Sequence, residues 1–223
     1  MPTRWFLILF FVFAVLQIVA QIFSLPILNY VSKPFLVILL IGYYRQSVSL
    51  PNGRFILALI FCWLGDVFLM LDDMNEIFFM AGLGSFLLAH VILIFAYKIF
   101  MSPDDNFQGT QRVRLSFPII LVGSGLVVIL YPRLGDLKFP VIVYAAALTL
   151  MVIQTIFRLG RTNSKSFWLV FFGAAFFMLS DSLLAINKFY APLSFAGLLI
   201  MTTYIAAIYL IVQGIIAHTE PSA

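Results

Sequence analysis

The chain has 223 residues, of which 63% are hydrophobic and only 10% are charged, and its mean hydropathy is +1.10. Soluble globular domains are about half apolar and about a quarter charged, so the composition excludes an ordinary water-soluble domain. The net charge of +4 comes from Lys and Arg residues scattered in ones and twos. This scatter argues against nucleic acid as a partner and is typical of the basic loops of a membrane protein.

Apolar segments predict a single transmembrane domain over residues 1–223, an all-α bundle of about eight helices. A bilayer core requires about 20 apolar residues per helix. The predicted spans are residues 5–23, 27–44, 55–71, 77–97, 113–131, 139–158, 167–187 and 194–216. The first span is longer than a typical signal-peptide core and no clear small-residue cleavage site follows it, so we expect it to be an uncleaved helix.

The distribution of Lys and Arg predicts that both termini are cytoplasmic, because basic loops stay on that side. If the spans alternate, nine basic residues share the face of the N-terminus and four lie on the other face. The nine are Arg4, Arg45, Arg54, Lys98, Arg112, Arg114, Arg158, Arg161 and Lys165. The four are Lys33, Arg133, Lys138 and Lys188. We expect a multi-pass protein of a bacterial inner membrane, although an endomembrane remains an alternative.

Two helices share a short sequence echo. Leu64-Gly-Asp-Val-Phe-Leu69 and Leu179-Ser-Asp-Ser-Leu-Leu184 align at an offset of 115 residues, at which Ala81-Gly82 also falls on Ala196-Gly197. The echo reflects either a duplication of four helices or chance identity in Leu-rich helices. In both cases, two similar helices each bring one Asp into the membrane.

These two residues, Asp66 and Asp181, are the candidates for chemistry. A carboxylate at bilayer depth costs at least ~2.5–3.5 kcal/mol on insertion scales, so it usually faces a polar cavity and marks a functional site. Counting from the helix ends places both in the outer half of the bilayer. The alternative is that each Asp is a buried hydrogen-bonding residue between helices.

Other polar residues are predicted near the same depth. The set comprises Lys33, Tyr144, Asn187 and Lys188, with His90 somewhat deeper. Lys33 and Lys188 also suit an interfacial anchor, because lysine side chains snorkel, and His90 also suits a buried histidine between helices. The convergence of these residues on one level favours a site.

Familiar catalytic and cofactor motifs are absent from the sequence, including a P-loop, a dinucleotide fingerprint and G-x-S-x-G. Ser180 precedes Asp181, but adjacent helical residues point apart and do not form a nucleophile–base pair by themselves. The single Cys62 is read as a packing residue, and two histidines cannot build a His-rich metal site. A metal held by Asp66, Asp181 and His90 is only weakly indicated, so we predict no cofactor and no metal.

The motifs together resemble the YhhN family of lysoplasmalogenase-like membrane proteins. They are Ser-Lys33-Pro34, Leu-Gly65-Asp66-Val-Phe-Leu, Gly82-x-x-x-Phe86-x-x-x-His90 and Gly173-Ala-x-x-Phe-x-x-Ser180-Asp181-x-x-Leu-Ala-x-Asn187-Lys188-Phe189. Their order and spacing cover nearly the whole chain. One departure is in the last helix, where Ala207 stands in place of a Gln that the family often carries.

The resemblance implies hydrolysis of the vinyl ether bond of lysoplasmalogens, lysophospholipids taken from the bilayer, to a fatty aldehyde and a glycerophospho-ethanolamine or -choline. Our hypothesis is that Asp66 and Asp181 face each other, one as general acid and the other stabilising the cation and positioning water. His90 or Tyr144 would orient a carboxyl group or the water. Lys33 and Lys188 would hold the phosphate, and Ser180 and Asn187 are further candidates for substrate binding.

Three other functions stay open at this point. Hydrolysis of another lysophospholipid bond would use the same cavity, whereas a proton- or ion-coupled lipid transporter would use the two Asp to carry the coupling ion. A structural role would make both Asp matter to stability alone. The sequence leaves the oligomeric state open, with a homo-oligomer as one option.

Overall fold

The computed structural model describes residues 3–102 and 109–219, and over these ranges the secondary structure is entirely helical, with eight α-helices. The chain divides into two compact units, residues 1–93 and 94–223. The division falls within α4 (Glu76–Ile99), so one continuous helix contributes to both units.

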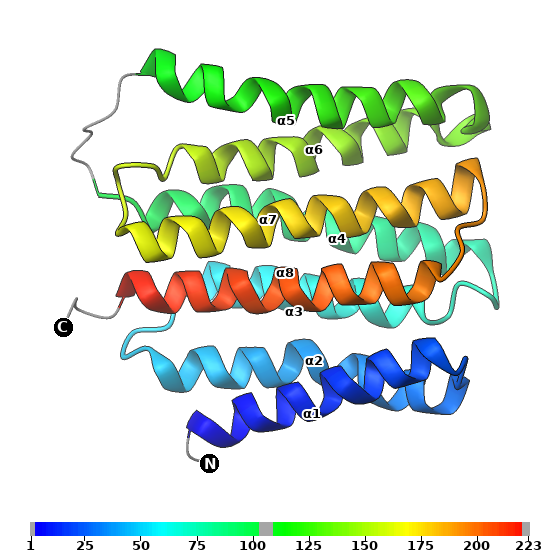
Figure 1. The fold of residues 1–223 in the computed structure, drawn as a ribbon, viewed down its shortest axis with the longest axis horizontal. Coiled ribbons are helices and arrows are strands. Elements are labelled where there is room, and N and C mark those ends of the chain that lie inside the picture. The colour runs from blue at the N-terminus through cyan, green and yellow to red at the C-terminus, as the bar shows by residue number, and fades with distance from the viewer. Residues whose placement is uncertain (1–2, 103–108, 220–223) are drawn as a thin grey trace. The chain divides into compact units, whose positions relative to one another are not determined.

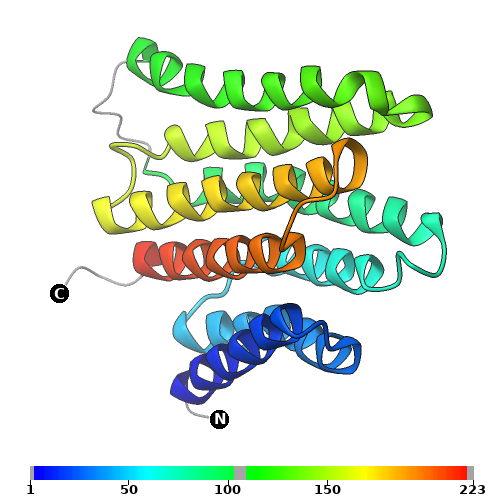
Figure 2. The same cartoon turned by 45° about the vertical axis from the view of Figure 1, so that its right-hand side comes forward.

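The first unit contains three complete helices and the beginning of α4. They are α1 (Thr3–Ile22), α2 (Pro26–Ser47) and α3 (Gly53–Leu69). Helices α1 and α2 lie side by side (Figures 1 and 2). The turn between them is short: Ser24 adopts a positive φ of 51°, and Pro26, whose missing N–H costs nothing in a first turn, begins α2.

Polar side chains join α1 to α2 inside these apolar helices. The Gln17 side chain donates to Asn29 Oδ1 at 2.7 Å and accepts from Ser32 Oγ at 2.5 Å. Gln21 donates to the same Asn29 oxygen at 3.1 Å. In lipid the hydrophobic effect does not drive helices together, so interhelical hydrogen bonds of this kind contribute to the association of α1 with α2.

Helix α3 begins at a side-chain cap and is short. The Asn52 side chain accepts hydrogen bonds from the backbone N–H groups of Arg54 and Phe55, two of the donors that a helix start leaves unpaired. The helix has 17 residues and ends at Leu69, where a turn begins at Met70. That length is at the lower limit of what a bilayer core requires.

The second unit contains the end of α4 and four further α-helices. They are α5 (Gly109–Leu130), α6 (Lys138–Ile156), α7 (Ser164–Ala185) and α8 (Ala196–Thr219). Short 3-10 turns at Tyr131–Arg133 and Gly135–Leu137 join α5 to α6, and a π turn at Ile186–Tyr190 ends α7. Helix α6 packs against α5 and α7, and α7 packs against α8 (Figures 1 and 2).

Two glycines allow α7 and α8 to approach closely. A Cβ atom on Gly173 would lie 2.9 Å from the Ala207 carbonyl oxygen, and one on Gly214 would lie 2.9 Å from the Val170 backbone nitrogen. Small residues at such points let helix backbones meet in a membrane, where packing contacts replace the hydrophobic effect.

Two buried arginines, one just after the end of α6 and one on α5, pack into the second unit. Arg158 is fully buried and donates to Ser166 Oγ at 2.6 Å, which in turn donates to the Gly214 carbonyl at 2.6 Å. Burial lowers the pKa of the Arg158 guanidinium to about 10, so the group remains charged at neutral pH. Arg112 donates to the Leu159 carbonyl at 3.0 Å, tying α5 to the α6–α7 connection.

The structure confirms the predicted all-α membrane bundle. Every predicted helix is present, and the largest difference at an end is four residues, at the start of α5 (predicted 113, observed Gly109). Seven of the described helices are long and apolar enough to cross a membrane, and α3 is the one below that length. The cytoplasmic location of both termini and the single-domain organisation stay predictions.

Candidate functional site

Asp66 is buried in the first unit, near the end of α3. Its side chain is only 3% exposed, and its Oδ1 lies 3.9 Å from Nζ of Lys33 on α2, whose side chain is 12% exposed. An ion pair with so little water around it requires both charges, because either one alone would be a buried, uncompensated charge.

Local sequence holds α2 against α3 at this ion pair. Pro34 follows Lys33 and cannot donate a hydrogen bond to the Tyr30 carbonyl one turn earlier. The Tyr30 hydroxyl donates to the Met70 carbonyl at the end of α3 at 3.1 Å. The helix segments that carry Lys33 and Asp66 are therefore joined by this hydrogen bond as well as by the ion pair.

Glycines bring α3 and α4 together next to Asp66. A Cβ on Gly65 would lie 2.6 Å from the Phe86 ring, and one on Gly82 would lie 2.8 Å from the Leu69 side chain. His90, one turn after Phe86 on α4, is fully buried. The glycine and aromatic positions of the sequence motifs thus have a packing reason.

Asp181 is buried in the second unit, on α7, and is 8% exposed. The hydroxyl group of Tyr144 on α6 donates to Asp181 Oδ2 at 2.5 Å. This hydrogen bond orients the carboxyl group and links two neighbouring helices. Here a neutral phenol takes the place that an ammonium group takes beside Asp66.

The residues around Asp181 bond mainly to the backbone. Ser180 Oγ donates to the Ile200 carbonyl on α8 at 3.1 Å. Asn187 Oδ1 accepts from the Leu193 N–H at 2.9 Å and so holds the turn between α7 and α8. Lys188 lies in the π turn and is exposed.

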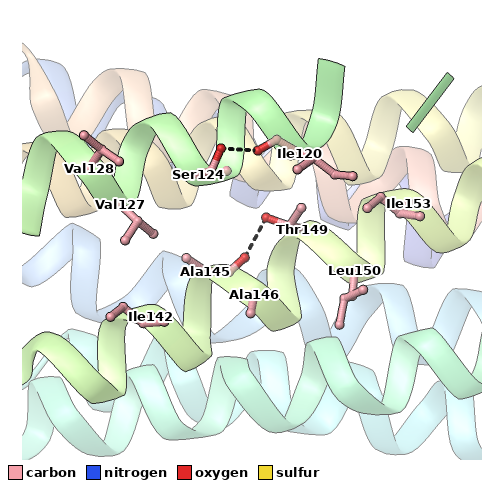
Figure 3. A pocket seen from close by; sticks show the side chains of 11 residues that line it. Ile120, Ser124, Val127, Val128, Ile142, Ala145, Ala146, Thr149, Leu150 and Ile153 are labelled. Carbon is pink, nitrogen blue, oxygen red and sulfur yellow. Dashed lines mark hydrogen bonds between the residues drawn. The ribbon is translucent and has the colours of Figure 1, made fainter. Parts of the chain in front are cut away.

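A groove of about 510 Å³ opens between α5 and α6 in the same unit (Figure 3). Aliphatic side chains and small residues line it: Ile120, Gly123, Ser124, Val127, Val128, Ile142, Ala145, Ala146, Thr149, Leu150 and Ile153. Its volume is in the range that holds small-molecule ligands.

Comparison with known proteins identifies the family of this chain. The model of the YhhN family matches residues 28–215. The chain belongs to the YhhN family. No solved structure matches it.

Curated relatives of this YhhN protein include proteins from mammals and mycobacteria. It is 30% identical to the human protein named lysoplasmalogenase TMEM86A, over 75% of this chain and 67% of the relative. It is 31% identical to human lysoplasmalogenase TMEM86B over 64% of this chain and 56% of the relative. It is 34% identical to the lysoplasmalogenase of Mycobacterium tuberculosis (strain CDC 1551 / Oshkosh), over 61% of this chain and half of the relative.

The structure brings some predicted site residues of this YhhN protein together. Lys33 meets Asp66, and Tyr144 meets Asp181, each from a neighbouring helix. Asp66 belongs to the first unit and Asp181 to the second, so the predicted facing of the two carboxyl groups stays a prediction. His90 is buried in the first unit, and Ser180, Asn187 and Lys188 stay candidates for substrate binding.

Sequence reasoning missed the polar network between α1 and α2. Gln17, Asn29 and Ser32 lie singly among apolar residues, so no motif marks them in the sequence. Their spacing was the available signal: Gln17 and Gln21 lie one turn apart, as do Asn29 and Ser32, so each pair shares one helix face.

Over residues 3–102 and 109–219, no group of three or more His, Cys, Asp or Glu side chains lies close enough to hold a metal ion. Lys33 beside Asp66 and Tyr144 beside Asp181 suit the two carboxyl groups to acid–base chemistry.

Proposed function

We propose that this YhhN protein is a lysoplasmalogenase, which hydrolyses the vinyl ether bond of lysoplasmalogens within the membrane. The observation that carries the proposal is its 30–34% identity to relatives named lysoplasmalogenase, over 61–75% of this chain. Two buried carboxyl groups, each oriented by a side chain of a neighbouring helix, support it with suitable chemistry.

Vinyl ether hydrolysis sets a clear demand on the site. A proton must reach the β-carbon of the alkenyl chain, which leaves an oxocarbenium ion at the carbon bonded to oxygen. Water then adds to that carbon and loses a proton, and the hemiacetal collapses to a fatty aldehyde and a glycerophospho-ethanolamine or -choline with a free hydroxyl group. An acid, a group that stabilises the cation and a place for water are all that the reaction needs.

Asp181 suits this chemistry through its bond to Tyr144. The phenol holds one carboxyl oxygen in place, and a hydroxyl group can accept or donate as the carboxyl group changes its protonation. Asp66 is proposed to be required as well, with Lys33 as its fixed counterion. The assignment of acid and cation-stabilising roles between the two Asp is a question for kinetics.

The surrounding residues suggest how the substrate is held. Lys188 is exposed in the turn after α7 and is proposed to bind the phosphate as a point charge. Asn187 is proposed to act by holding that turn, since its side-chain oxygen accepts from the Leu193 N–H. His90, buried on α4 in the first unit, is proposed to orient a carboxyl group or the water.

The membrane placement is part of the proposal. Nine basic residues lie at the helix ends that share a side with the N-terminus under alternating topology, which supports cytoplasmic termini. Lys33, Lys188 and the two Asp then belong to the outer half of the bilayer. A bacterial inner membrane, with substrate taken directly from the lipid phase, fits this arrangement.

The test is a paired product analysis. Protein purified in mild detergent is incubated with a lysoplasmalogen or with the ester-linked lysophospholipid of the same head group and chain, and mass spectrometry follows aldehyde and fatty acid separately. We expect aldehyde from the vinyl ether lipid and no fatty acid from the ester. Fatty acid from the ester lipid, or no product from either with folded protein, would overturn the proposal.

A further inference from the structure

The groove between α5 and α6 presents an apolar surface throughout. Its two hydroxyl groups bond to their own helices: Ser124 Oγ donates to the Ile120 carbonyl and Thr149 Oγ1 to the Ala145 carbonyl, both at 2.7 Å (Figure 3). Such bonds satisfy a hydroxyl group locally. The surface left for an occupant is aliphatic, so the groove fits a hydrocarbon chain.

Small residues create this groove. Gly123 touches α6 closely, since a Cβ there would lie 2.1 Å from Thr149 Oγ1. Ala145 and Ala146 have short side chains, so the adjacent surface of α6 is recessed. An apolar space that stays empty forfeits the dispersion contacts of its walls, so in a bilayer a lipid chain is the favoured occupant.

The groove lies near the helix segments that carry Tyr144 and Asp181. Ala145, in its wall, directly follows Tyr144, which donates to Asp181. A Cβ on Gly123 would also lie 3.3 Å from Cε of Met178. Met178 lies three residues before Asp181 on α7, and residues so spaced share one helix face.

Under the proposed topology, the groove runs inward from the level of Tyr144, as the chain of a lipid with its head group at the outer side would. Figure 3 shows Val128 and Ile142 at one end and Ile120 and Ile153 at the other. Tyr144 is near the first end, close to the start of α6, and Ile153 is nine residues further along, about 14 Å at 1.5 Å per residue.

We propose that this groove binds the single alkenyl chain of the lysoplasmalogen, which runs from the level of Tyr144 toward Ile153. This inference rests on the proposed function and adds a subsite that determines which chain lengths are accepted. The far end, at Ile120 and Ile153, then sets how long a chain can lie in the groove.

Substitutions at the far end test the inference. Ile120→Trp fills that end from α5, where Ile120 is 46% exposed and a larger side chain meets little protein. Leu121→Trp is the matched control, because Leu121 is the next residue, is similarly exposed and does not line the groove. Ile153→Trp fills the same end from α6 and gives a second, independent variant.

The readout is the ratio of kcat/KM for an octadecenyl to a dodecenyl lysoplasmalogen. We expect Ile120→Trp and Ile153→Trp to lower the ratio about tenfold, an order-of-magnitude figure for a closed subsite, and Leu121→Trp to leave it unchanged. An unchanged ratio in both folded groove variants overturns the inference while leaving a working lysoplasmalogenase.

A second measurement does not depend on turnover. A lysophospholipid with a photoreactive diazirine at its chain terminus is bound to the wild-type protein, irradiated and mapped by mass spectrometry. Labelling of α5 or α6 near Ile120 and Ile153 is expected, with loss of that label in Ile120→Trp. Labelling confined to other helices would contradict the groove, and absence of aldehyde in the product analysis would contradict the proposed function instead.

Discussion

Asp66 and Asp181 occupy the same place in a shared sequence pattern but have different partners. Asp66 is paired with the Lys33 ammonium group at 3.9 Å, whereas Asp181 accepts a hydrogen bond from the neutral Tyr144 hydroxyl at 2.5 Å. Removing the charge of Asp66 leaves a cation in a poorly hydrated place. A neutral Asn in place of Asp181 can still accept the Tyr144 hydrogen bond, so we expect a smaller effect on folding there.

The residues before the two Asp differ as well. Gly65 makes room for the Phe86 ring on α4, and Ser180 donates to the Ile200 carbonyl on α8. One unit joins its helix pair by close packing at this position, and the other by a hydrogen bond. Equivalent positions in a sequence echo therefore carry different interactions.

The largest expected effect is the loss of the ion pair in the first unit. Asp66→Asn leaves Lys33 without its counterion, and breaking a buried pair in this way costs about 3 kcal/mol or more. We expect a clear fall in Tm in detergent. The double variant Lys33→Met/Asp66→Leu removes both charges and should recover most of the loss; a Tm as low as that of the single variant would mean that the pair does not explain the effect.

Gly65→Ala is expected to have the next largest effect on stability. Its new Cβ would lie 2.6 Å from the Phe86 ring, so the Phe86 side chain or one of the two helices must shift. Overpacking of this kind lowers the free energy of unfolding by about 1–3 kcal/mol. Gly84→Ala on α4 is the control, because a Cβ there meets nothing within 4 Å. Thermal unfolding of the two variants side by side checks the packing; equal Tm values would contradict it.

Tyr144→Phe should have a smaller effect on stability and a larger one on turnover. Loss of the hydrogen bond to Asp181 costs about 1–1.5 kcal/mol. Because the carboxyl group also loses its orienting partner, we expect kcat to fall while the protein stays folded at assay temperature. Wild-type kcat in Tyr144→Phe would separate this tyrosine from the chemistry.

Ser180→Ala should have the smallest effect. Interhelical hydrogen bonds in membranes are worth about 0.6 kcal/mol on average, so losing the bond to the Ile200 carbonyl should lower Tm only slightly. Aldehyde production measured alongside tests whether Ser180, a candidate for substrate binding, also takes part in turnover. A loss of turnover as large as that of Tyr144→Phe would give Ser180 a part in substrate binding and remove this difference between the units.

The helices could be predicted from sequence because long apolar runs and polar breaks fix their approximate ends. The start of α5 was placed four residues late, since Gly109 to Arg112 are not apolar. The two Asp were also identifiable, because a carboxyl group inside such a run is costly unless it is paired.

The partners of these groups could not be predicted, because they depend on how each helix is rotated and on which helices are neighbours. The ion pair of Lys33 with Asp66 is one such partner, and phosphate binding by Lys33 stays a prediction. The hydrogen bond that Asn187 accepts from the Leu193 backbone N–H is another, and its place near the substrate stays a prediction. Helical periodicity gives little help here, since these helices are apolar on most faces.

The most direct test of the account is aldehyde production by Asp181→Asn protein. Asn keeps the shape of the side chain and an oxygen for the Tyr144 hydroxyl, but it cannot exchange a proton as a carboxyl group does. We predict a folded protein, with a Tm close to wild type, that releases no detectable fatty aldehyde from a lysoplasmalogen. Aldehyde released at the wild-type rate by this folded variant would contradict the claim that Asp181 takes part in the reaction.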